Sequence, residues 1–406
     1  MNKIYNTFFE LIRVAIGTQD TLSRPLSEKE WAQVYDLAKK QSIIGICFAG
    51  LRRMGANASK GFESIGISKK LYITWMSVAA KIQGRNEVMN KLCARLEEKL
   101  TADGYQSCVL KGQGVASLYK VSPTLSKDSA SGTYGEGGNG TRPRHEAPAL
   151  IDLSLLRQSG DIDTWMVAKP KTVIEWARRT GKMYYYDYHH ADLEIFPETE
   201  VELHYRPSLS RNLVRDGKLQ KWFRKEGGKH IVPNKELGFS MPDYEFNILL
   251  TMNHNFFHLL YEGVGMRQFL DLFFILKSCT DDAQRAKAWK LLRYMHLKRF
   301  TRASMWLMKE VFGLDDKYLV CEPDAEAGKF LLKEIMKAGN FGKYDKRLED
   351  GRYSGSRVGL MITWVRHTFR LFKFYPSDVL WTPIGILRIS LWRRWHYRKE
   401  DELKNL

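Results

Sequence analysis

The spacing of hydrophobic residues changes twice along this chain, and each spacing predicts a different kind of element. In residues 1–100 apolar side chains recur three or four positions apart, as at Trp31 and Val34, which predicts amphipathic helices. Residues 101–235 contain stretches in which apolar and polar residues alternate, such as Val201-Glu202-Leu203-His204-Tyr205, and these predict strands. After that region the helical spacing returns. The pattern therefore predicts an α+β protein.

Composition marks two further segments. Residues 122–150 are rich in serine, glycine and charged residues. Such a stretch buries too little apolar surface to order itself, so we predict a disordered insertion, with a substrate-closing lid as the alternative. The predicted organisation is a helical region over 1–100, a mixed region over 101–235 that includes the insertion, a helical domain over 236–345 and a basic, aromatic segment over 346–406.

The segment 346–406 alternates large aromatic residues with cationic ones. Its aromatic residues are Trp364, Phe369, Phe372, Phe374, Tyr375, Trp381, Trp392, Trp395 and Tyr397, and its cations include Arg366, Arg370, Lys373, Arg388, Arg393, Arg394, Arg398 and Lys399. Tryptophan and tyrosine beside cations suit a membrane interface. The same pairing suits stacking on unpaired bases with phosphate contacts. An anionic membrane surface and nucleic acid are therefore both open as partners.

Charge and cysteine content bear on partners and compartment. The formal net charge of +18 permits nucleic acid, anionic membranes and phosphorylated substrates, but it does not predict a fold. The five cysteines are far apart and show no zinc-ligand spacing, so we expect buried free thiols in a reducing compartment. No signal-peptide pattern or membrane-spanning apolar run is evident. The expectation is a cytoplasmic protein, with peripheral membrane association as the open variant.

Two aspartates one residue apart form the strongest chemical signal. The stretch Gly160-Asp161-Ile162-Asp163 is followed by the largely apolar Trp165-Met166-Val167, which predicts a strand. In a strand, Asp161 and Asp163 leave the same face while Ile162 enters the core. Converging carboxylates repel and raise each other's pKa unless a cation lies between them. Mg²⁺ suits such ligands, and the geometry suits two-metal phosphoryl or nucleotidyl transfer. A solvated turn is the structural alternative.

A glycine turn precedes this pair and a further carboxylate follows it. A short apolar strand runs into Lys111-Gly112-Gln113-Gly114, where glycines would let backbone N–H groups approach phosphate and Lys111 would add a positive charge. An ordinary strand-to-helix turn is the alternative. The later strand Val201-Glu202-Leu203 offers Glu202 as the third carboxylate, with Glu194 on the neighbouring strand as its competitor.

Five histidines are further candidates. His189 and His190 follow a tyrosine-rich strand, and because neighbours on a strand face opposite sides, at most one should reach the site. His204 would share a face with the third carboxylate and contact substrate. His254 and His258 are four residues apart on a predicted helix. They lack the glutamate of a zinc-protease motif, which favours packing or substrate contact over metal binding.

Two charged residues accompany these motifs. Arg157 precedes the aspartate pair and would either contact phosphate or lie in solvent. Asp271 lies within the strongly apolar helical segment from Met266 to Lys277. A buried acid needs a partner, so Asp271 is expected to have one and to be structural.

The ordered set of motifs resembles the nucleotidyltransferase superfamily with a DNA polymerase beta-like palm. More narrowly, it resembles the bacterial group called uncharacterised nucleotidyltransferases. The matching residues are Leu110-Lys111-Gly112, Arg157-x-x-Gly160-Asp161-Ile162-Asp163, His189-His190, Glu202-Leu203-His204 and Phe269-Leu270-Asp271-Leu272, spread over the first three quarters of the chain. Two departures stand out: Gly112-Gln113-Gly114 replaces the usual Gly-Ser or Gly-Gly pair, and the gap before Asp161 is unusually long.

This resemblance implies a polymerase beta-like palm with a mixed sheet, flanked by helical N-terminal and C-terminal regions. It implies a Mg²⁺-dependent enzyme, or one using Mn²⁺, in which Asp161, Asp163 and Glu202 are the catalytic and metal-binding residues. The implied nucleotide contacts are Lys111, Gly112, Gln113, Gly114, Arg157, Gly160, His189, His190 and His204. The enzyme would move a nucleoside monophosphate from an NTP to an unidentified hydroxyl or phosphate acceptor, whether small molecule, protein or RNA. The departures motivate a second hypothesis, a catalytically decayed palm that binds nucleotide, nucleic acid or membrane.

Overall fold

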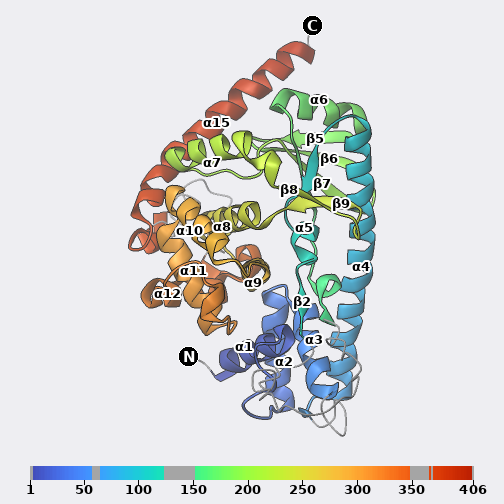
Figure 1. The fold of residues 1–406 in the computed structure, drawn as a ribbon, viewed down its shortest axis with the longest axis vertical. Coiled ribbons are helices and arrows are strands. Elements are labelled where there is room, and N and C mark those ends of the chain that lie inside the picture. Colours follow the sequence, from blue (N-terminus) through green and yellow to red (C-terminus); the bar gives the residue numbers. More distant parts are fainter. Residues whose placement is uncertain (1–2, 57–64, 123–150, 348–364, 367–368, 405–406) are drawn as a thin grey trace, which may run out of the picture.

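The computed structural model describes residues 3–56, 65–122, 151–347, 365–366 and 369–404, and its fold is α+β (Figure 1). A mixed sheet lies beside the long helix α4 (Lys69–Ala102), and a group of helices lies on the other side of the molecule. Helices α1 to α3 occupy one end. The predicted fold class, a mixed sheet with helical flanks, is therefore confirmed.

Five strands form the main sheet in the order β1-β4-β7-β6-β5. Their bounds are Ser107–Val109 for β1, Ile162–Met166 for β4, Lys182–Tyr186 for β5, His190–Phe196 for β6 and Thr199–His204 for β7. The pair β4 and β7 is parallel and the other neighbours are antiparallel. In the parallel pair Asp163 lies opposite Glu202, and Trp165 lies opposite His204. The register thus brings two predicted site residues side by side.

Alternation along the strands gives this sheet one apolar face and one polar face. On β7, Val201 and Leu203 are fully buried in a core that α4 and α6 (Pro170–Thr180) complete. Glu202 and His204 take the intervening positions and point to the opposite face. The alternation that predicted the strand therefore also decides which side of the sheet carries chemistry.

The N-terminal region is helical, as its spacing predicts. It contains α1 (Lys3–Ile16), α2 (Glu28–Lys40), α3 (Ile44–Ala56) and the long helix α4. Ser27 caps α2, because its side chain accepts from the Glu30 N–H while the Glu30 carboxylate accepts from the Ser27 N–H. These helices share one hydrophobic core with helices near residue 300, so sequence-distant regions pack together.

The segment between β1 and β4 joins the sheet through short elements. They are α5 (Gln113–Ala116), β2 (Lys120–Val121), β3 (Ile151–Asp152) and the 3₁₀ turn η3 (Ser154–Leu156). The predicted insertion lies outside the described residues apart from Ser122. Strands β2 and β3 pair antiparallel, so the two ends of this long segment meet. The extra chain length therefore leaves the β1–β4 pairing intact.

The remaining elements follow β7 along the chain. They are α7 (Leu213–Lys225), η4 (Gly227–His230), β8 (Ile231–Asn234), β9 (Phe239–Pro242), α8 (Tyr244–Tyr261), α9 (Met266–Ser278), α10 (Asp282–Tyr294), α11 (Lys298–Glu310), η5 (Asp316–Tyr318), α12 (Ala325–Ala338), η6 (Asn340–Gly342) and α15 (Pro376–Lys404). Among them, α8, α9 and α15 line the polar face of the sheet. Gly181 ends α6, and the Asp243 side chain caps α8 by accepting from the Phe246 N–H.

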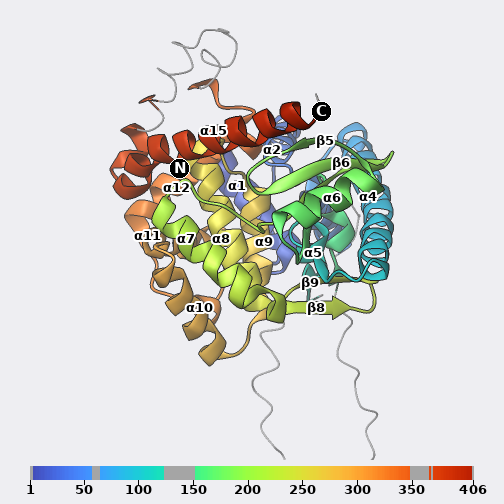
Figure 2. The same ribbon diagram turned by 90° about the horizontal axis from the view of Figure 1, so that it is seen from above.

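Helix α15 crosses the molecule from the C-terminal helices to the sheet (Figure 2). Arg388 donates to Asp216 at 2.8 Å, and the Tyr397 hydroxyl donates to the Tyr186 carbonyl at 2.6 Å. Arg215 forms a buried ion pair with Asp378. The described part of the basic, aromatic segment is thus packed onto the rest of the protein. The division of the chain at residues 100, 235 and 345 stays a prediction.

Two smaller expectations concern thiols and membranes. All five cysteines are free; four are buried and Cys321 is partly exposed. Among the helices of the described residues, none is both long and apolar enough to cross a bilayer.

Candidate active site

A cavity of about 550 Å³ opens beside the polar face of the sheet. Its lining comes from β4, β6 and β7, from residues 207–211, and from α8, α9 and α15. Small-molecule sites span roughly 300–1,000 Å³, so this cavity can hold a ligand of nucleotide size. Most of the predicted site residues lie around it.

The three predicted carboxylates line this cavity. Asp163 is buried on β4 beside Glu202 of β7, while Asp161 is exposed immediately before β4 begins. Ile162 between them is buried in the core, as the strand pattern predicts. Glu194, the competitor for the third carboxylate, is half exposed, pairs with Lys182 and does not line the cavity.

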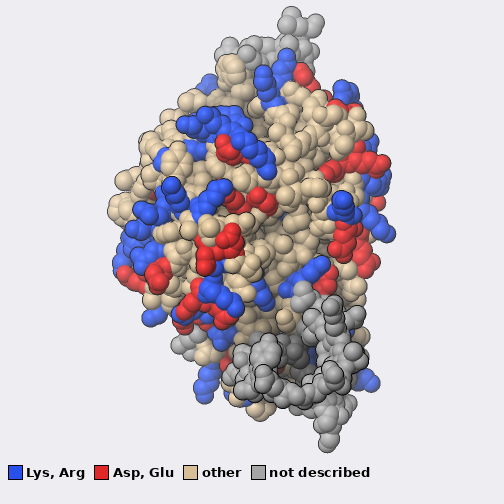
Figure 3. Space-filling view, in the orientation of Figure 1, with Lys and Arg blue, Asp and Glu red and all other residues tan. Residues whose placement is uncertain are grey.

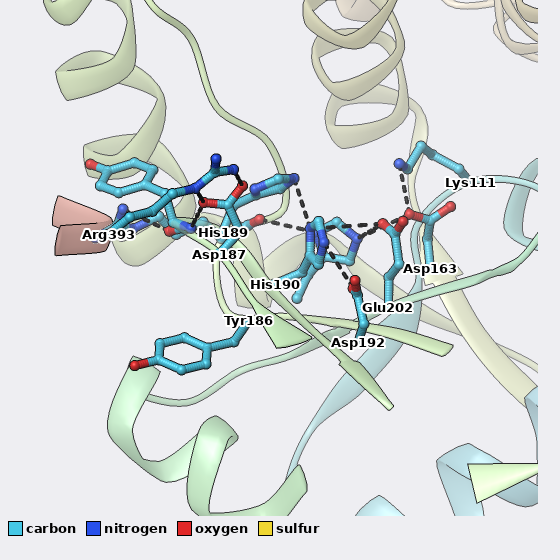
Figure 4. A network of polar contacts seen from close by, with 12 residues as sticks. Lys111, Asp163, Tyr186, Asp187, His189, His190, Asp192, Glu202 and Arg393 are labelled. Carbon is cyan, nitrogen blue, oxygen red and sulfur yellow. Dashed lines mark hydrogen bonds and ion pairs between the residues drawn. The ribbon is translucent and has the colours of Figure 1, made fainter. Parts of the chain in front are cut away.

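Asp163 is the most heavily engaged of these carboxylates (Figure 4). Its Oδ1 lies 2.7 Å from Lys111 Nζ and 3.0 Å from His204 Nε2. His204 Nε2 is also 3.2 Å from a carboxylate oxygen of Glu202. His204 therefore bridges the aspartate and the glutamate, while Lys111 pairs with the aspartate.

These contacts shift the pKa values of the cluster in opposite directions. Burial opposes ionisation of Asp163, but Lys111 and His204 outweigh it and hold the pKa of Asp163 well below its ordinary value. Burial disfavours the charged His204, yet hydrogen bonds to Asp163 and Glu202 raise its pKa to about 9. The charge of Asp163 is the main cause that raises the pKa of Asp161 to about 7. The predicted mutual elevation therefore occurs at Asp161 only, because Asp163 has cationic neighbours.

Both neighbouring histidines reach the cavity, which corrects the expectation that at most one does. Strand β6 begins at His190, and His189 lies in the preceding bend, so strand alternation does not apply to it. His189 Nε2 lies 2.9 Å from His190 Nδ1, and His190 Nε2 lies 2.9 Å from Asp192. Burial, then the charges of His190 and His204, lower the pKa of His189 well below its ordinary value.

Three overlapping groups of ligand atoms could hold a metal ion among the described residues. In each group the donor atoms lie within 4.8 Å of one another: Asp163 with Glu202 and His204, His190 with Asp192 and Glu202, and His189 with His190 and His204. Oxygen donors suit Mg²⁺, whereas imidazoles suit transition metals. Asp161 lines the cavity but belongs to none of these groups. Asp163 and Glu202 fit the expected carboxylate set, and Asp161 would join it through an ion between them.

Residues 151–313 match the model of a family described as uncharacterised nucleotidyltransferase. Over these residues the chain is similar to a nucleotidyltransferase domain. The matched segment runs from β3 through α11 and contains all three predicted carboxylates. No curated protein and no solved structure matches the chain.

The glycine turn lies outside the matched segment, and only part of it faces the cavity. Lys111 and Gly112 line the cavity, whereas Gln113 and Gly114 do not. Gln113 is buried and donates to Asn90. A Cβ on Gly114 would lie 2.1 Å from the Val109 carbonyl oxygen, so close backbone packing requires glycine there. Gly160 also lines the cavity, with open space around it.

Arg157 is neither solvated nor free for phosphate. It is 5 % exposed and donates through Nε and Nη2 to the two Asp271 oxygens, both at 2.7 Å. Tyr119 donates to the same carboxylate at 2.6 Å. The expectation that Asp271 needs a partner is thus met by a bidentate ion pair, and this pair ties the segment before Asp161 to α9.

Several cavity residues escaped sequence reasoning. Asp192 is opposite Glu202 in the antiparallel β6–β7 pair, and its spacing from His190 was the available signal. Asp187 accepts from Arg393 of α15 at 2.6 and 3.1 Å, across 206 residues. No local pattern marks such a contact. Of the predicted helix pair, His254 and His258 both line the cavity and contact each other through Nε2 atoms at 2.9 Å.

Proposed function

We propose that the protein transfers a nucleoside monophosphate from an NTP to a hydroxyl or phosphate acceptor, with Mg²⁺ or Mn²⁺ held by Asp161, Asp163 and Glu202. One observation carries this proposal: Asp163 and Glu202 are register neighbours on parallel strands, and Asp161 lines the same cavity. When bound, such ions activate an attacking hydroxyl and stabilise the leaving pyrophosphate. The nucleotidyltransferase match over residues 151–313 supports the reaction class.

The neighbours of the carboxylates have complementary roles in this proposal. His204 orients Asp163 and Glu202 together through its Nε2. Lys111 offsets negative charge at the cluster, since the nearby carboxylates, chiefly Asp163, raise its pKa despite burial. Lys111 is thereby kept charged beside the position where phosphate would bind. Both residues reduce the repulsion among carboxylates that must ionise together.

A labelled-transfer assay with a matched pair of variants tests the assignment of the third carboxylate. The protein is incubated with each α-³²P-labelled NTP, Mg²⁺ or Mn²⁺, and cell extract. Glu202→Gln is expected to lower transfer about 10²-fold or more, because a metal-binding carboxylate contributes several kcal/mol and each 1.4 kcal/mol is about tenfold. Glu194→Gln, on the adjacent strand outside the cavity, is expected to retain transfer.

The acceptor is identified in the same assay by the molecule that carries the label. Equal transfer by wild type and Glu202→Gln would contradict the assignment of Glu202. Loss of transfer in Glu194→Gln instead would assign the role to the neighbouring strand.

One observation favours the alternative of a catalytically decayed palm. Lys111 and His204 already satisfy Asp163 without an ion, at 2.7 and 3.0 Å. Under this alternative no NTP is turned over, and Asp163→Asn changes nucleotide binding little. Absence of label transfer, together with unchanged nucleotide affinity in Asp163→Asn, would replace the enzymatic proposal.

The outer face of α15 supports an additional role at an anionic membrane surface. Leu380, Ile384, Leu387, Leu391 and Trp395 recur at helical spacing and are 64, 48, 58, 57 and 57 % exposed. Leucine and isoleucine bury well in lipid but offer no ring for base stacking, which favours membrane over nucleic acid. On the face in Figure 3, Lys and Arg are scattered among Asp and Glu and form no unbroken patch.

Vesicle sedimentation tests this role with substitutions that spare the packed side of α15. We expect Leu387→Glu/Leu391→Glu to weaken binding to phosphatidylserine vesicles at least tenfold, since each buried leucine contributes about 1.5–3 kcal/mol. Val232→Glu alters an exposed apolar residue on β8 and is the control. Equal binding by all three proteins would reject the role, and binding to RNA that falls steeply with salt would favour nucleic acid.

A further inference from the structure

The cavity carries cationic groups at two ends, with the carboxylates between them. In Figure 4 the Lys111–Asp163 pair lies on one side of Glu202 and His190, and the Asp187–Arg393 pair lies on the other. A further arginine belongs to the second end. Arg211 lines the cavity and packs against Gly385 of α15, the helix that carries Arg393.

Arg211 has no oxyanion partner among the described residues. None of their carboxylates forms an ion pair with it, and its buried Nε has no hydrogen-bond partner. Two carboxylates act electrostatically on Arg211, and both already have other partners: Asp187 accepts from Arg393, and Glu262 lies 2.8 Å from His258 Nδ1. The guanidinium is therefore available to an anion that enters the cavity.

The protein holds Arg211 in place by packing instead of by ion pairing. Its guanidinium carbon lies 3.9 Å from the centre of the Tyr261 ring, and the Tyr261 hydroxyl contacts Thr382 of α15 at 3.2 Å. A Cβ on Gly385 of α15 would lie 2.4 Å from the Arg211 carbonyl oxygen, so the helix packs directly on this residue. A guanidinium ordered in this way loses little entropy when it binds a planar or tetrahedral oxyanion.

Burial without a counter-ion makes Arg211 a strong candidate for anion binding. Desolvation is the main cause that lowers its pKa, although a guanidinium still stays charged at neutral pH. A desolvated charge without a partner is unfavourable, and an oxyanion would remove that penalty while adding charge-assisted hydrogen bonds. Arg267 lines another part of the cavity, where it donates to the Gln158 carbonyl at 2.9 Å, three residues before Asp161.

We propose that Arg211 binds an oxyanion carried by the acceptor, so that the acceptor is a phosphate- or carboxylate-bearing molecule. The assignment to the acceptor rests on the proposed nucleotidyl transfer, in which the third carboxylate, Glu202, lies on the side of the attacking group. Arg211 packs against α15, whose Arg393 pairs with Asp187 on the far side of Glu202 from Lys111 in Figure 4. Arg267 donates to the Gln158 carbonyl, three residues before Asp161, and is left for the NTP phosphates. The acceptor subsite is thus formed jointly by residues 207–211 and α15.

Calorimetric titration of the full chain with inorganic phosphate and with acetate tests this subsite, with and without Mg²⁺ and α,β-methylene-ATP. Wild type is expected to bind one phosphate in both conditions, and Arg211→Gln at least tenfold more weakly. The phosphate affinity of Arg211→Lys should lie between those of wild type and Arg211→Gln, because an ammonium group keeps the charge but lacks the paired N–H donors of a guanidinium. Arg299→Gln is the matched control, since Arg299 also stacks on a ring, that of Phe374 at 4.9 Å, outside the cavity.

The outcomes separate this inference from the proposed function. Equal phosphate affinity in wild type and Arg211→Gln, or no phosphate binding by wild type, would overturn the subsite. Loss of α,β-methylene-ATP binding in Arg211→Gln would overturn its assignment to the acceptor. Tighter binding of acetate than of phosphate at the same site would support a carboxylate-bearing acceptor. Failure of wild type to transfer label, with phosphate binding still dependent on Arg211, would reject the nucleotidyl transfer and keep the oxyanion site.

Discussion

Replacement of Asp161 by asparagine is expected to reduce nucleotidyl transfer about 10³-fold or more while slightly stabilising the metal-free protein. The loss follows if Asp161 shares bound metal ions with Asp163, because that stabilisation contributes several kcal/mol to the transition state. The gain in stability follows because Asp161 forms no ion pair among the described residues and is repelled by Asp163. Function and stability should therefore change in opposite directions.

The stabilisation should depend on pH with a definite sign. The pKa of Asp161 is raised to about 7 in the folded protein, chiefly by Asp163, so ionisation of Asp161 opposes folding. This penalty is absent below the ordinary pKa of an aspartate, grows as pH rises and is complete above about pH 7. Asp161→Asn removes the penalty, so its unfolding free energy should rise above that of wild type as pH increases from the ordinary pKa of an aspartate to about 7. Because the side chain is exposed, the gain should stay below about 1 kcal/mol.

Urea denaturation in EDTA at pH 5 and pH 8, beside the labelled-transfer assay, measures both effects. Asp36→Asn is the matched control, since Asp36 is an exposed aspartate in an i,i+4 pair with Lys40, away from the cavity. Retained transfer in Asp161→Asn would contradict a metal-binding role. A destabilised Asp161→Asn at pH 8 would show that this carboxylate has a stabilising partner.

Replacement of Asp271 by alanine should produce the largest loss of stability, about 3–5 kcal/mol. It would leave the buried Arg157 without its bidentate partner and the Tyr119 hydroxyl without its acceptor. The pKa of Arg157 is raised by Asp271 despite burial, which means that the pair favours the charged guanidinium. The segment before Asp161 would also lose its connection to α9.

A double-mutant cycle separates the free energy lost with the ion pair from the free energy lost when a smaller side chain leaves a cavity. In Arg157→Met/Asp271→Leu both charges are removed, so much of the lost unfolding free energy should return relative to Asp271→Ala. Glu326→Gln is the control, because Glu326 and Lys373 form a pair with side chains 66 and 69 % exposed and should contribute less than about 1 kcal/mol. A loss below 1 kcal/mol in Asp271→Ala would contradict the structural role of the pair.

The sequence by itself determined the α+β class, the helical flanks and the order of the carboxylate motifs. These features depend on local periodicity: alternation along β7 separates Val201 and Leu203 from Glu202 and His204, and Ser27 and Asp243 mark helix starts by capping. The same short-range rules predicted that Asp271 needs a partner. They failed at His189, where the chain leaves strand geometry one residue before β6 begins.

Only the tertiary structure decided which distant residues complete the cavity. Arg157 meets Asp271 across 114 residues, Asp187 meets Arg393 across 206, and Arg211 is packed between Tyr261 and Gly385. It also decided that α15 forms a cavity wall and that Lys111 contacts Asp163. Periodicity encodes which face of an element is buried, but the partner on that face depends on how all the elements pack together. The sequence therefore indicates that a charged residue in an apolar segment needs a counter-charge. Only the fold determines which residue supplies that counter-charge, or, at Arg211, that no carboxylate of the described residues does so.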